Sequence, residues 1–314
     1  MLNISDYFFK EESRCGYTIS EAMKKGWAIQ LTVLDEVLSI AKKHELNIWM
    51  EYGSLIGAVR HNGYVPWDDD IDICMPREDY MKFLFILQKE LPPFRKVYSF
   101  YTCDNYPYPK AFVCCRDVID LGISEKEASI TNQLYNCPYA TGIDIFPLDF
   151  IPANTDYWNY LSQLYSISYN LGIDYEAYLQ TNELDSFLSQ LEQTLNYHVS
   201  RDGNLRDSIW KLTDAISMMT TKEEAKWLTW YPEYTMCGDR RKRSLEAYSE
   251  TIMVDFEMIK VPIPVGYDEV LKSEYGENYM TPIKGTTGHD YPFYKNQERK
   301  ILFHNRIGQI GDIF

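Results

Sequence analysis

The sequence lacks a long hydrophobic run, a CxxC cysteine pair and a surplus of positive charge. No stretch approaches the roughly 20 apolar residues of a membrane-spanning helix, and the first residues lack the basic start and apolar middle of a secretory signal. Lysine and arginine number 31 against 46 aspartates and glutamates, a net charge of −15. Because phosphate backbones bind to basic faces, we expect no nucleic-acid partner. We expect a cytoplasmic protein without a transmembrane segment, able to associate peripherally with the inner membrane face.

The cysteines indicate neither a zinc site nor a disulfide framework. There are 7, an odd count, and the adjacent Cys114 and Cys115 suit neither zinc geometry nor an ordinary disulfide. We interpret them as reduced, buried residues. The chain also has no internal repeat, low-complexity tract or long linker. Hydrophobic residues make up 45% of its 314 residues, which is ample for a real core.

The spacing of apolar residues predicts a mixed α/β fold. Helices are expected over residues 20–45, 55–60, 76–91 and 268–275, with a largely helical stretch over 156–231. Strands are expected over residues 47–52, 70–74, 96–101, 110–115, 142–146 and 252–261. The simplest architecture is a single catalytic domain over residues 1–314. Its core would come from about 1–150 and 250–314, with the helical segment of about 151–249 between them.

The most informative segment is GSLIGAVRHNGYVPWDDDID, from Gly53 to Asp72. Like carboxylates repel one another strongly where water is excluded, so a fold that gathers these aspartates must expose them or neutralise them with a cation. The alternation over residues 70–74 predicts that Asp70 and Asp72 project from one face of a strand. Asp69 should face away from Asp70, and Asp68 should precede the strand, so these two are second choices as ligands.

Three other interpretations of the acidic segment fit its residues less well. In an EF-hand loop, Ile73 would stand where a glycine makes the turn and Asp79 where a glutamate chelates. A DxD signature of nucleotide-sugar glycosyltransferases is a weak signal by itself. A solvated acidic turn would not carry Trp67 and interleaved isoleucines. Nucleotidyltransferase folds instead combine a Gly-Ser helix start, an acidic-apolar-acidic strand and a third carboxylate from a neighbouring strand. Gly53-Ser54, Asp70-Ile71-Asp72 and Asp144 match these parts.

The run from Gly53 to Tyr80 resembles the signature of the LicD family of phosphocholine transferases, whose distant relatives include fukutin-type alditol-phosphate transferases. Supporting segments are Tyr108-Pro109-Lys110, Gly142 to Asp149, and Tyr267 to Tyr279 with its Tyr-Gly pair. The resemblance implies a nucleotidyltransferase-like mixed β-sheet core with flanking helices. It also implies transfer of phosphocholine from CDP-choline to a hydroxyl of a cell-surface glycan or its precursor, with release of CMP, as in lipopolysaccharide or teichoic acid biosynthesis.

Other functions stay open at this point. A CDP-alditol such as CDP-ribitol or CDP-glycerol could be the donor, or a nucleotide could be transferred to a small acceptor with release of pyrophosphate. The acidic site could also hold a metal only for the fold or for a protein interaction. Residues of about 155–240 match no motif, so the identity of the glycan or glycolipid acceptor is not specified.

The resemblance implies a role for individual residues. Asp70, Asp72 and Asp144 are the expected catalytic carboxylates and ligands of Mg²⁺ or Mn²⁺, Asp144 being either a ligand or the acceptor of the hydroxyl proton. Gly53 and Ser54 would contact the diphosphate. Phosphate charge would be compensated by Arg60, His61, Arg77 and Lys110, or these would pair with the acidic cluster. Tyr64 and Trp67 are candidates for binding the trimethylammonium group, whereas Tyr52 is expected to pack. His289 is a further candidate on the acceptor side.

Overall fold

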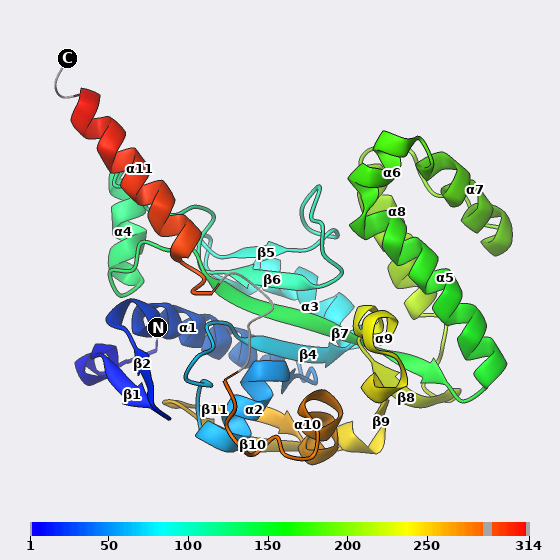
Figure 1. The fold of residues 1–314 in the computed structure, drawn as a ribbon, viewed down its shortest axis with the longest axis horizontal. Coiled ribbons are helices and arrows are strands. Elements are labelled where there is room, and N and C mark those ends of the chain that lie inside the picture. Colours follow the sequence, from blue (N-terminus) through cyan, green and yellow to red (C-terminus); the bar gives the residue numbers. More distant parts are fainter. Residues whose placement is uncertain (1, 285–290, 312–314) are drawn as a thin grey trace.

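The computed structural model describes residues 2–284 and 291–311, so His289 lies outside the described residues. Its centre is a 7-stranded mixed sheet whose main path runs β3-β4-β7-β6-β5 (Figure 1). These strands are β3 (Trp49–Met50), β4 (Asp72–Pro76), β7 (Gly142–Pro152), β6 (Ala111–Cys114) and β5 (Lys96–Tyr98). Strands β4 and β7 are parallel. The second half of β7 pairs with β8 (Ala225–Thr229), which pairs with β9 (Arg243–Ser244).

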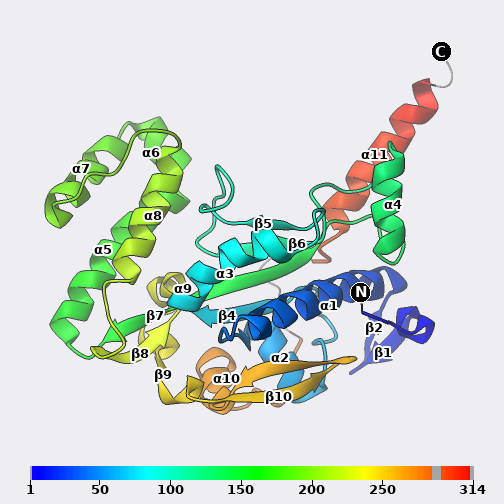
Figure 2. The same ribbon diagram turned by 180° about the vertical axis from the view of Figure 1, so that it is seen from behind.

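The two faces of the sheet differ, and this difference positions the site. Ile73 and Ile145 belong to the main core, which also includes α1 (Glu21–Lys43) and α3 (Arg77–Glu90); both helices are seen in Figure 2. Cys74 and Phe146 belong to a second cluster on the opposite face. Because strand side chains alternate between faces, Asp72 and Asp144 project with Cys74 and Phe146, away from the main core.

Shorter elements surround the acidic end of the sheet. Helix α2 (Tyr52–His61) follows β3 directly, and α10 (Tyr267–Tyr275) contacts it. The antiparallel hairpin of β10 (Thr251–Phe256) and β11 (Ile259–Pro264) lies against α2 and β3. A second hairpin consists of β1 (Glu12–Arg14) and β2 (Tyr17–Ile19), and α4 (Glu125–Gln133) precedes β7. The last described helix is α11 (Lys295–Gly311).

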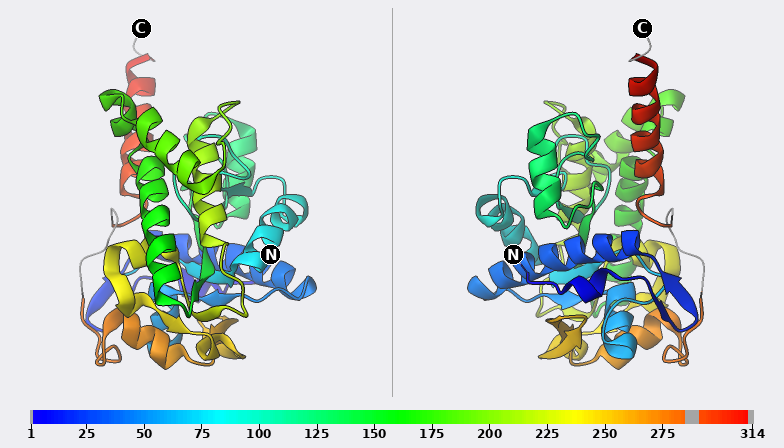
Figure 3. Two further views of the ribbon diagram at one scale, coloured as in Figure 1. Left: turned by 90° about the vertical axis from the view of Figure 1, so that its right-hand side faces the viewer. Right: turned by 90° about the vertical axis from the view of Figure 1, so that its left-hand side faces the viewer.

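The central part of the chain is helical and has a core of its own. It comprises α5 (Thr155–Ile173), α6 (Tyr175–Thr181), α7 (Leu184–Leu195) and α8 (Leu205–Ser217), followed after β8 by α9 (Tyr231–Cys237). Leu161, Leu188 and Ile209 are fully buried in this separate core of the helical segment. Helices α5 to α8 extend to one side of the sheet (Figures 1 and 3). In the described part of the chain, no helix combines the length and apolar character that crossing a membrane requires.

The α/β fold class is confirmed, and several element boundaries are corrected. Strand β7 continues through Pro147 because its second half pairs with β8, a strand inside the stretch predicted to be helical. The single strand predicted over residues 252–261 is the β10–β11 hairpin. The strand predicted over 47–52 is only two residues long, since α2 already begins at Tyr52. The arrangement as one catalytic domain stays a prediction.

Candidate active site

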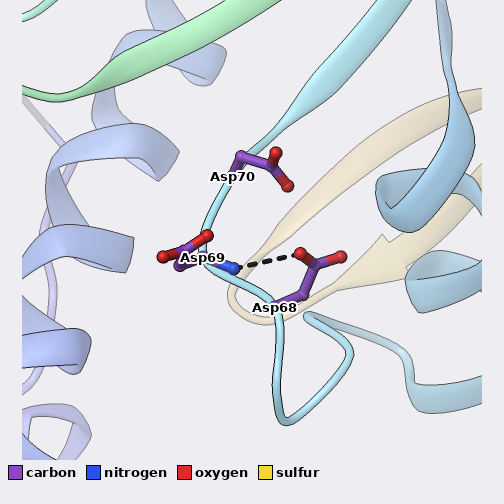
Figure 4. A group of neighbouring side chains, drawn as sticks. All are labelled: Asp68, Asp69 and Asp70. Carbon is purple, nitrogen blue, oxygen red and sulfur yellow. Dashed lines mark hydrogen bonds between the residues drawn. The ribbon is translucent and has the colours of Figure 1, made fainter. Parts of the chain in front are cut away.

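The chain between α2 and β4 carries three adjacent carboxylates, Asp68, Asp69 and Asp70. One ligand oxygen from each lies within 4.8 Å of the other two. Figure 4 shows the carboxylates of Asp68 and Asp70 on one side of the chain and that of Asp69 on the other. Asp69 is fully buried, and its Oδ2 accepts a hydrogen bond of 2.5 Å from the backbone N–H of Phe293. Asp69 thus ties the loop to the C-terminal segment, whereas Asp68 and Asp70 face a common space.

The other two carboxylates lie on neighbouring strands. Asp72 begins β4 and is paired in register with Asp144 of the parallel strand β7, which places their Cα atoms about 4.8 Å apart. Lys110 donates to Oδ2 of Asp144 at 2.7 Å. Asp70 lies in the irregular segment before β4, so the prediction that Asp70 and Asp72 occupy one strand is wrong. Electrostatically the two remain neighbours, because Asp70 is among the charges that raise the pKa of Asp72.

The carboxylates in this group are costly to ionise together. Burial raises the pKa of Asp72 well above its ordinary value, and the charges of Asp70 and Asp144 add to the effect while Lys110 opposes it. Burial also raises the pKa of Asp68, helped by the charge of Asp70. For Lys110, burial would lower the pKa, but the charges of Asp144, Asp72 and Asp70 raise it overall. A single lysine therefore offsets only part of the negative charge.

The donor set fits a hard divalent cation. All the converging ligand atoms are carboxylate oxygens, with no histidine or cysteine among the group found in the described residues. Oxygen-only sets favour Mg²⁺, Mn²⁺ or Ca²⁺ over softer metals. A bound cation would also remove the repulsion that raises the pKa values of Asp68 and Asp72. The acidic cluster can thus hold a metal ion, and we treat the individual ligands as part of the proposal below.

The start of α2 is joined to the acidic cluster at two points. The hydroxyl of Ser54 is buried and accepts a hydrogen bond of 2.9 Å from the backbone N–H of Asp72. A Cβ atom built on Gly53 would collide with Oδ2 of Asp68. Gly53 is therefore needed for the close approach of the Asp68 carboxylate to the first turn of the helix. Ser54 has a structural role besides any contact with a ligand.

Gly53→Ala should weaken metal binding without weakening the fold. The added methyl group displaces the Asp68 carboxylate, while alanine is intrinsically a better helix residue than glycine. We expect the affinity for Mn²⁺, measured by calorimetry, to fall about tenfold, and the unfolding temperature to stay at or above the wild-type value. In an Asp68→Asn background the same substitution should have little further effect. Unchanged affinity in the single variant would contradict a ligand role for Asp68.

Arg60, His61 and Trp67 form a separate group at the C-terminal end of α2. Arg60 donates through Nη1 to the backbone oxygen of Tyr279 at 2.5 Å. The rings of His61 and Trp67 are 6.5 Å apart and close to perpendicular. Tyr64 is a core residue, because its ring is stacked on Trp27 at 4.2 Å and its hydroxyl donates to Gln30 at 3.0 Å. The described side chains therefore give no aromatic box of Tyr64 and Trp67 around the carboxylates.

The environment of His61 predicts a pH effect on stability. Burial lowers the pKa of His61 to about 4, and the positive charges of Arg60 and Arg14 contribute. Between pH 6.5 and 4 the unfolded chain binds the proton more readily, so this residue makes stability fall as the pH falls through that window. His61→Asn should show a shallower decline of the unfolding temperature between pH 6.5 and 4 than the wild type. Identical slopes would argue against the lowered pKa.

Arg77 is placed apart from the acidic cluster. Its guanidinium pairs with Asp149 at 2.7 Å and with Asp214 at 2.7 Å, and all three side chains are nearly buried. Asp149 lies on β7 and Asp214 on α8, so this ion group connects the sheet to the helical segment. Arg77 already has two carboxylate partners. We therefore do not assign Arg77 to phosphate binding. Its carboxylate partners are Asp149 and Asp214, not the acidic cluster with which the sequence analysis expected it to pair.

A buried charge network next to the site was missed by the sequence reasoning. Glu51, directly before α2, is 1% exposed and pairs at 2.8 Å with Arg243, whose exposed fraction is 0%. Glu233 accepts a hydrogen bond of 3.0 Å from the hydroxyl of Tyr52 and pairs with Arg241 at 3.0 Å. Tyr52 itself has a φ of +43°, an uncommon conformation for a tyrosine. The available signal was Glu51 itself, a lone carboxylate in an apolar run.

Tyr275 is a second residue that the sequence reasoning left without a role. It ends α10, immediately before Gly276, in the Tyr-Gly pair noted as a supporting motif. Burial raises the pKa of Tyr275 well above its ordinary value, and the charges of Glu274, Asp68 and Asp72 act in the same direction. The tail segment is thus close enough to the acidic cluster to feel its charge. Tyr275 is 44% exposed, and its helix α10 contacts α2, whose first turn adjoins Asp68.

Comparison with known proteins agrees with this geometry. Residues 45–106 match the family model described as LicD/FKTN/FKRP, nucleotidyltransferase domain. This segment of 62 residues is similar to that nucleotidyltransferase domain. The match includes β3, α2, the acidic loop, β4 and α3. Lys110 and Asp144 lie outside the matched LicD-type segment, and the pairing of β7 with β4 and β6 brings them to it.

Three curated proteins are similar to parts of the chain. The lipopolysaccharide cholinephosphotransferase LicD of Haemophilus influenzae is 38% identical over 60 residues, 19% of this chain. An uncharacterised protein of Rickettsia typhi is 32% identical over 143 residues, 45% of this chain. An uncharacterised protein of Rickettsia prowazekii is 34% identical over 96 residues, 30% of this chain. The matches cover 23%, 40% and 33% of the lengths of these relatives.

Proposed function

We propose that the chain is a Mg²⁺-dependent transferase that moves phosphocholine from CDP-choline to a hydroxyl of a cell-surface glycan or its precursor, releasing CMP. The observation that carries the proposal is the register pair of Asp72 and Asp144, with Lys110 on Asp144, beside a LicD-type helix start. The similarity to a lipopolysaccharide cholinephosphotransferase supports the choice of donor. Phosphoryl transfer asks a protein mainly for positioning and charge neutralisation, and this site offers both.

The start of α2 is suited to the donor diphosphate. The side chain of Glu51, the residue before the helix, makes no capping hydrogen bond because it turns to Arg243. The first backbone N–H groups of a helix have no partner within it and attract phosphate oxygens. Gly53 and Ser54 supply two of these groups next to Asp68 and Asp72. In this proposal the diphosphate lies between the helix start and the carboxylates.

The carboxylates and Lys110 have different roles in the proposed site. Mg²⁺ held by Asp70, Asp72 and Asp144 would neutralise the diphosphate and favour the departure of CMP. Lys110 holds the Asp144 carboxylate at 2.7 Å and fixes its orientation on β7. Asp68 is held against Gly53 and can provide a further ligand oxygen. In this proposal the ion is held by carboxylates from the two strands β4 and β7 and from the loop before β4.

An aromatic group lies beside Lys110 and suits a choline headgroup. The ring of Phe146 is 4.9 Å from the Lys110 ammonium, 4.7 Å from the ring of Trp230 and 5.1 Å from that of Tyr52. A trimethylammonium has no hydrogen to donate and is held best by aromatic faces. We therefore assign the choline end of the donor to Phe146, Trp230 and Tyr52, in place of Tyr64 and Trp67.

Parallel incubations of the purified chain with CDP-choline, CDP-ribitol and CTP test this proposal. In the presence of Mg²⁺ we expect CMP from CDP-choline, with water as a slow substitute for the glycan hydroxyl, and none after addition of a chelator. CMP from CDP-ribitol alone would assign an alditol donor. Pyrophosphate from CTP would assign nucleotidyl transfer. Absence of every nucleotide product, also with glycan acceptors added, would leave the non-enzymatic interpretation.

A further inference from the structure

Among the described side chains of helix α11, the contacts with the body of the protein lie in its first turns. Gln297 accepts from the backbone N–H of Ala140 at 2.8 Å and donates to its oxygen at 2.7 Å. Glu298 accepts a hydrogen bond of 2.8 Å from the hydroxyl of Tyr139. Ile301 packs against the main core. Beyond these contacts the helix extends past the rest of the ribbon (Figures 1 and 3).

The outward face of α11 carries large apolar side chains that are well exposed. Leu302 is 57% exposed, Phe303 67% and Ile307 52%. Phe303 and Ile307 are four residues apart and lie on one face, and Leu302 lies next to Phe303 around the helix, so the three side chains form one broad exposed apolar strip. Single exposed apolar residues need no explanation, but a strip along a projecting helix indicates an interaction surface.

The same face is basic in a chain that is strongly acidic. Arg299, Lys300 and Arg306 lie within one turn of the apolar strip, and all three are exposed. In the described part of the chain none of them forms an ion pair with a carboxylate. Glu298, the one acidic residue of the helix, is engaged with Tyr139 on the inner side. The whole chain has a net charge of −15, so this helix differs in sign from the average surface.

We propose that the strip of Leu302, Phe303 and Ile307, flanked by Arg299, Lys300 and Arg306, docks the protein on the surface of an anionic lipid bilayer. Apolar side chains at one-turn spacing can enter the boundary of the acyl chains, while long basic side chains reach the phosphates of the headgroups. The acidic remainder of the chain is repelled by such a surface, so α11 determines which side of the protein meets the membrane. This proposal does not depend on the transferase activity.

Co-sedimentation of the full chain with vesicles tests the proposal. Wild type should bind vesicles of mixed phosphatidylglycerol and phosphatidylcholine and show little binding to phosphatidylcholine alone, and high salt should weaken the binding. The triple variant Leu302→Ser/Phe303→Ser/Ile307→Ser should bind at least about tenfold more weakly, because it loses the buried apolar contacts. The triple variant Arg299→Gln/Lys300→Gln/Arg306→Gln should bind anionic vesicles more weakly by a similar factor, and its remaining binding should no longer depend on salt.

A matched control removes equally exposed apolar side chains elsewhere. Met236, Met253 and Tyr197 are 66%, 53% and 57% exposed, and their triple replacement by serine should leave vesicle binding unchanged. Circular dichroism would establish that each variant is folded. The proposal fails if wild type ignores anionic vesicles, or if the control loses as much binding as the α11 variant. It also fails if light scattering shows that α11 holds two copies of the chain together and its serine variant releases monomers that bind vesicles normally.

Discussion

Asp72→Asn should reduce CMP release by about 100- to 1,000-fold while leaving the protein as stable as wild type or more so. The loss is expected because Asp72 is the direct register partner of Asp144 on the neighbouring parallel strand, so both carboxylates belong to the proposed site. Activity and stability should change in opposite directions, because the proposed metal ligand destabilises the fold when no metal is bound. Asp144→Asn should lose activity to a similar extent.

The expected gain in stability follows from the direction of the pKa. Burial and the charges of Asp70 and Asp144 raise the pKa of Asp72 above its unfolded value. A carboxyl whose pKa is higher in the folded state than in the unfolded state makes the folded protein less stable as the pH rises above the unfolded-state pKa of 3.8. At pH 7 and without divalent ions, asparagine removes this penalty. The unfolding temperature of Asp72→Asn should therefore be equal to or above that of wild type.

Thermal unfolding with and without Mg²⁺ makes the experiment decisive. Wild type should gain stability on addition of Mg²⁺, because an ion that binds only the folded state raises its stability. Asp72→Asn should gain much less. Asp202→Asn, at an exposed position outside the site, serves as the control and should behave as wild type in both assays. Full turnover by Asp72→Asn, or loss of its cooperative unfolding, would show that the carboxylate has a different role.

Local pattern predicted the parts of the site that lie within one strand or one turn. Asp144 was expected as a third carboxylate from a neighbouring strand, and its register with Asp72 agrees with a shared site. The exclusion of Asp69 from the side of Asp70 also followed from alternation, and Figure 4 agrees with it. Asp70 itself was placed in a strand that begins two residues later. The ends of a strand depend on its hydrogen bonds to neighbouring strands, and the sequence of one segment does not specify these partners.

Long-range partners account for the rest. Arg77 and Asp214 are 137 positions apart, and nothing near Arg77 in sequence indicates that α8 supplies its second carboxylate. Tyr64 and Trp67 both flank the acidic run, yet Tyr64 is held in the core by its stacking on Trp27. Glu51 and Arg243 are 192 positions apart, and Arg243 stands in a basic run that is typical of an exposed surface. In these cases the residue type indicates the kind of interaction, but the interaction partner is known only from the three-dimensional structure.

Arg243→Met should destabilise the protein by about 3–5 kcal/mol, the largest stability effect we expect from a single substitution. Burial would lower the pKa of Arg243, but Glu51 and neighbouring groups raise it well above the ordinary value, so the guanidinium stays charged. Arg243 bonds to Glu51 at 2.9 Å and to the hydroxyl of Tyr248 at 3.0 Å. Methionine would leave the carboxylate of Glu51 buried and without this partner at the start of α2.

Removing both charges should restore most of the lost stability. In Glu51→Leu/Arg243→Met both members of the pair are removed, Glu233 keeps its ion pair with Arg241, and apolar replacements of buried ion pairs are often close to neutral. Denaturant unfolding of both single variants and the double variant would give the coupling free energy directly. Additive losses in this cycle would contradict a direct pairing. The ion pair of Glu51 and Arg243 also holds the positive φ of Tyr52 at the start of α2 if the double variant recovers stability but not the full rate of CMP release. The reason is that the first turn of α2 could then relax away from Asp68 and Asp72.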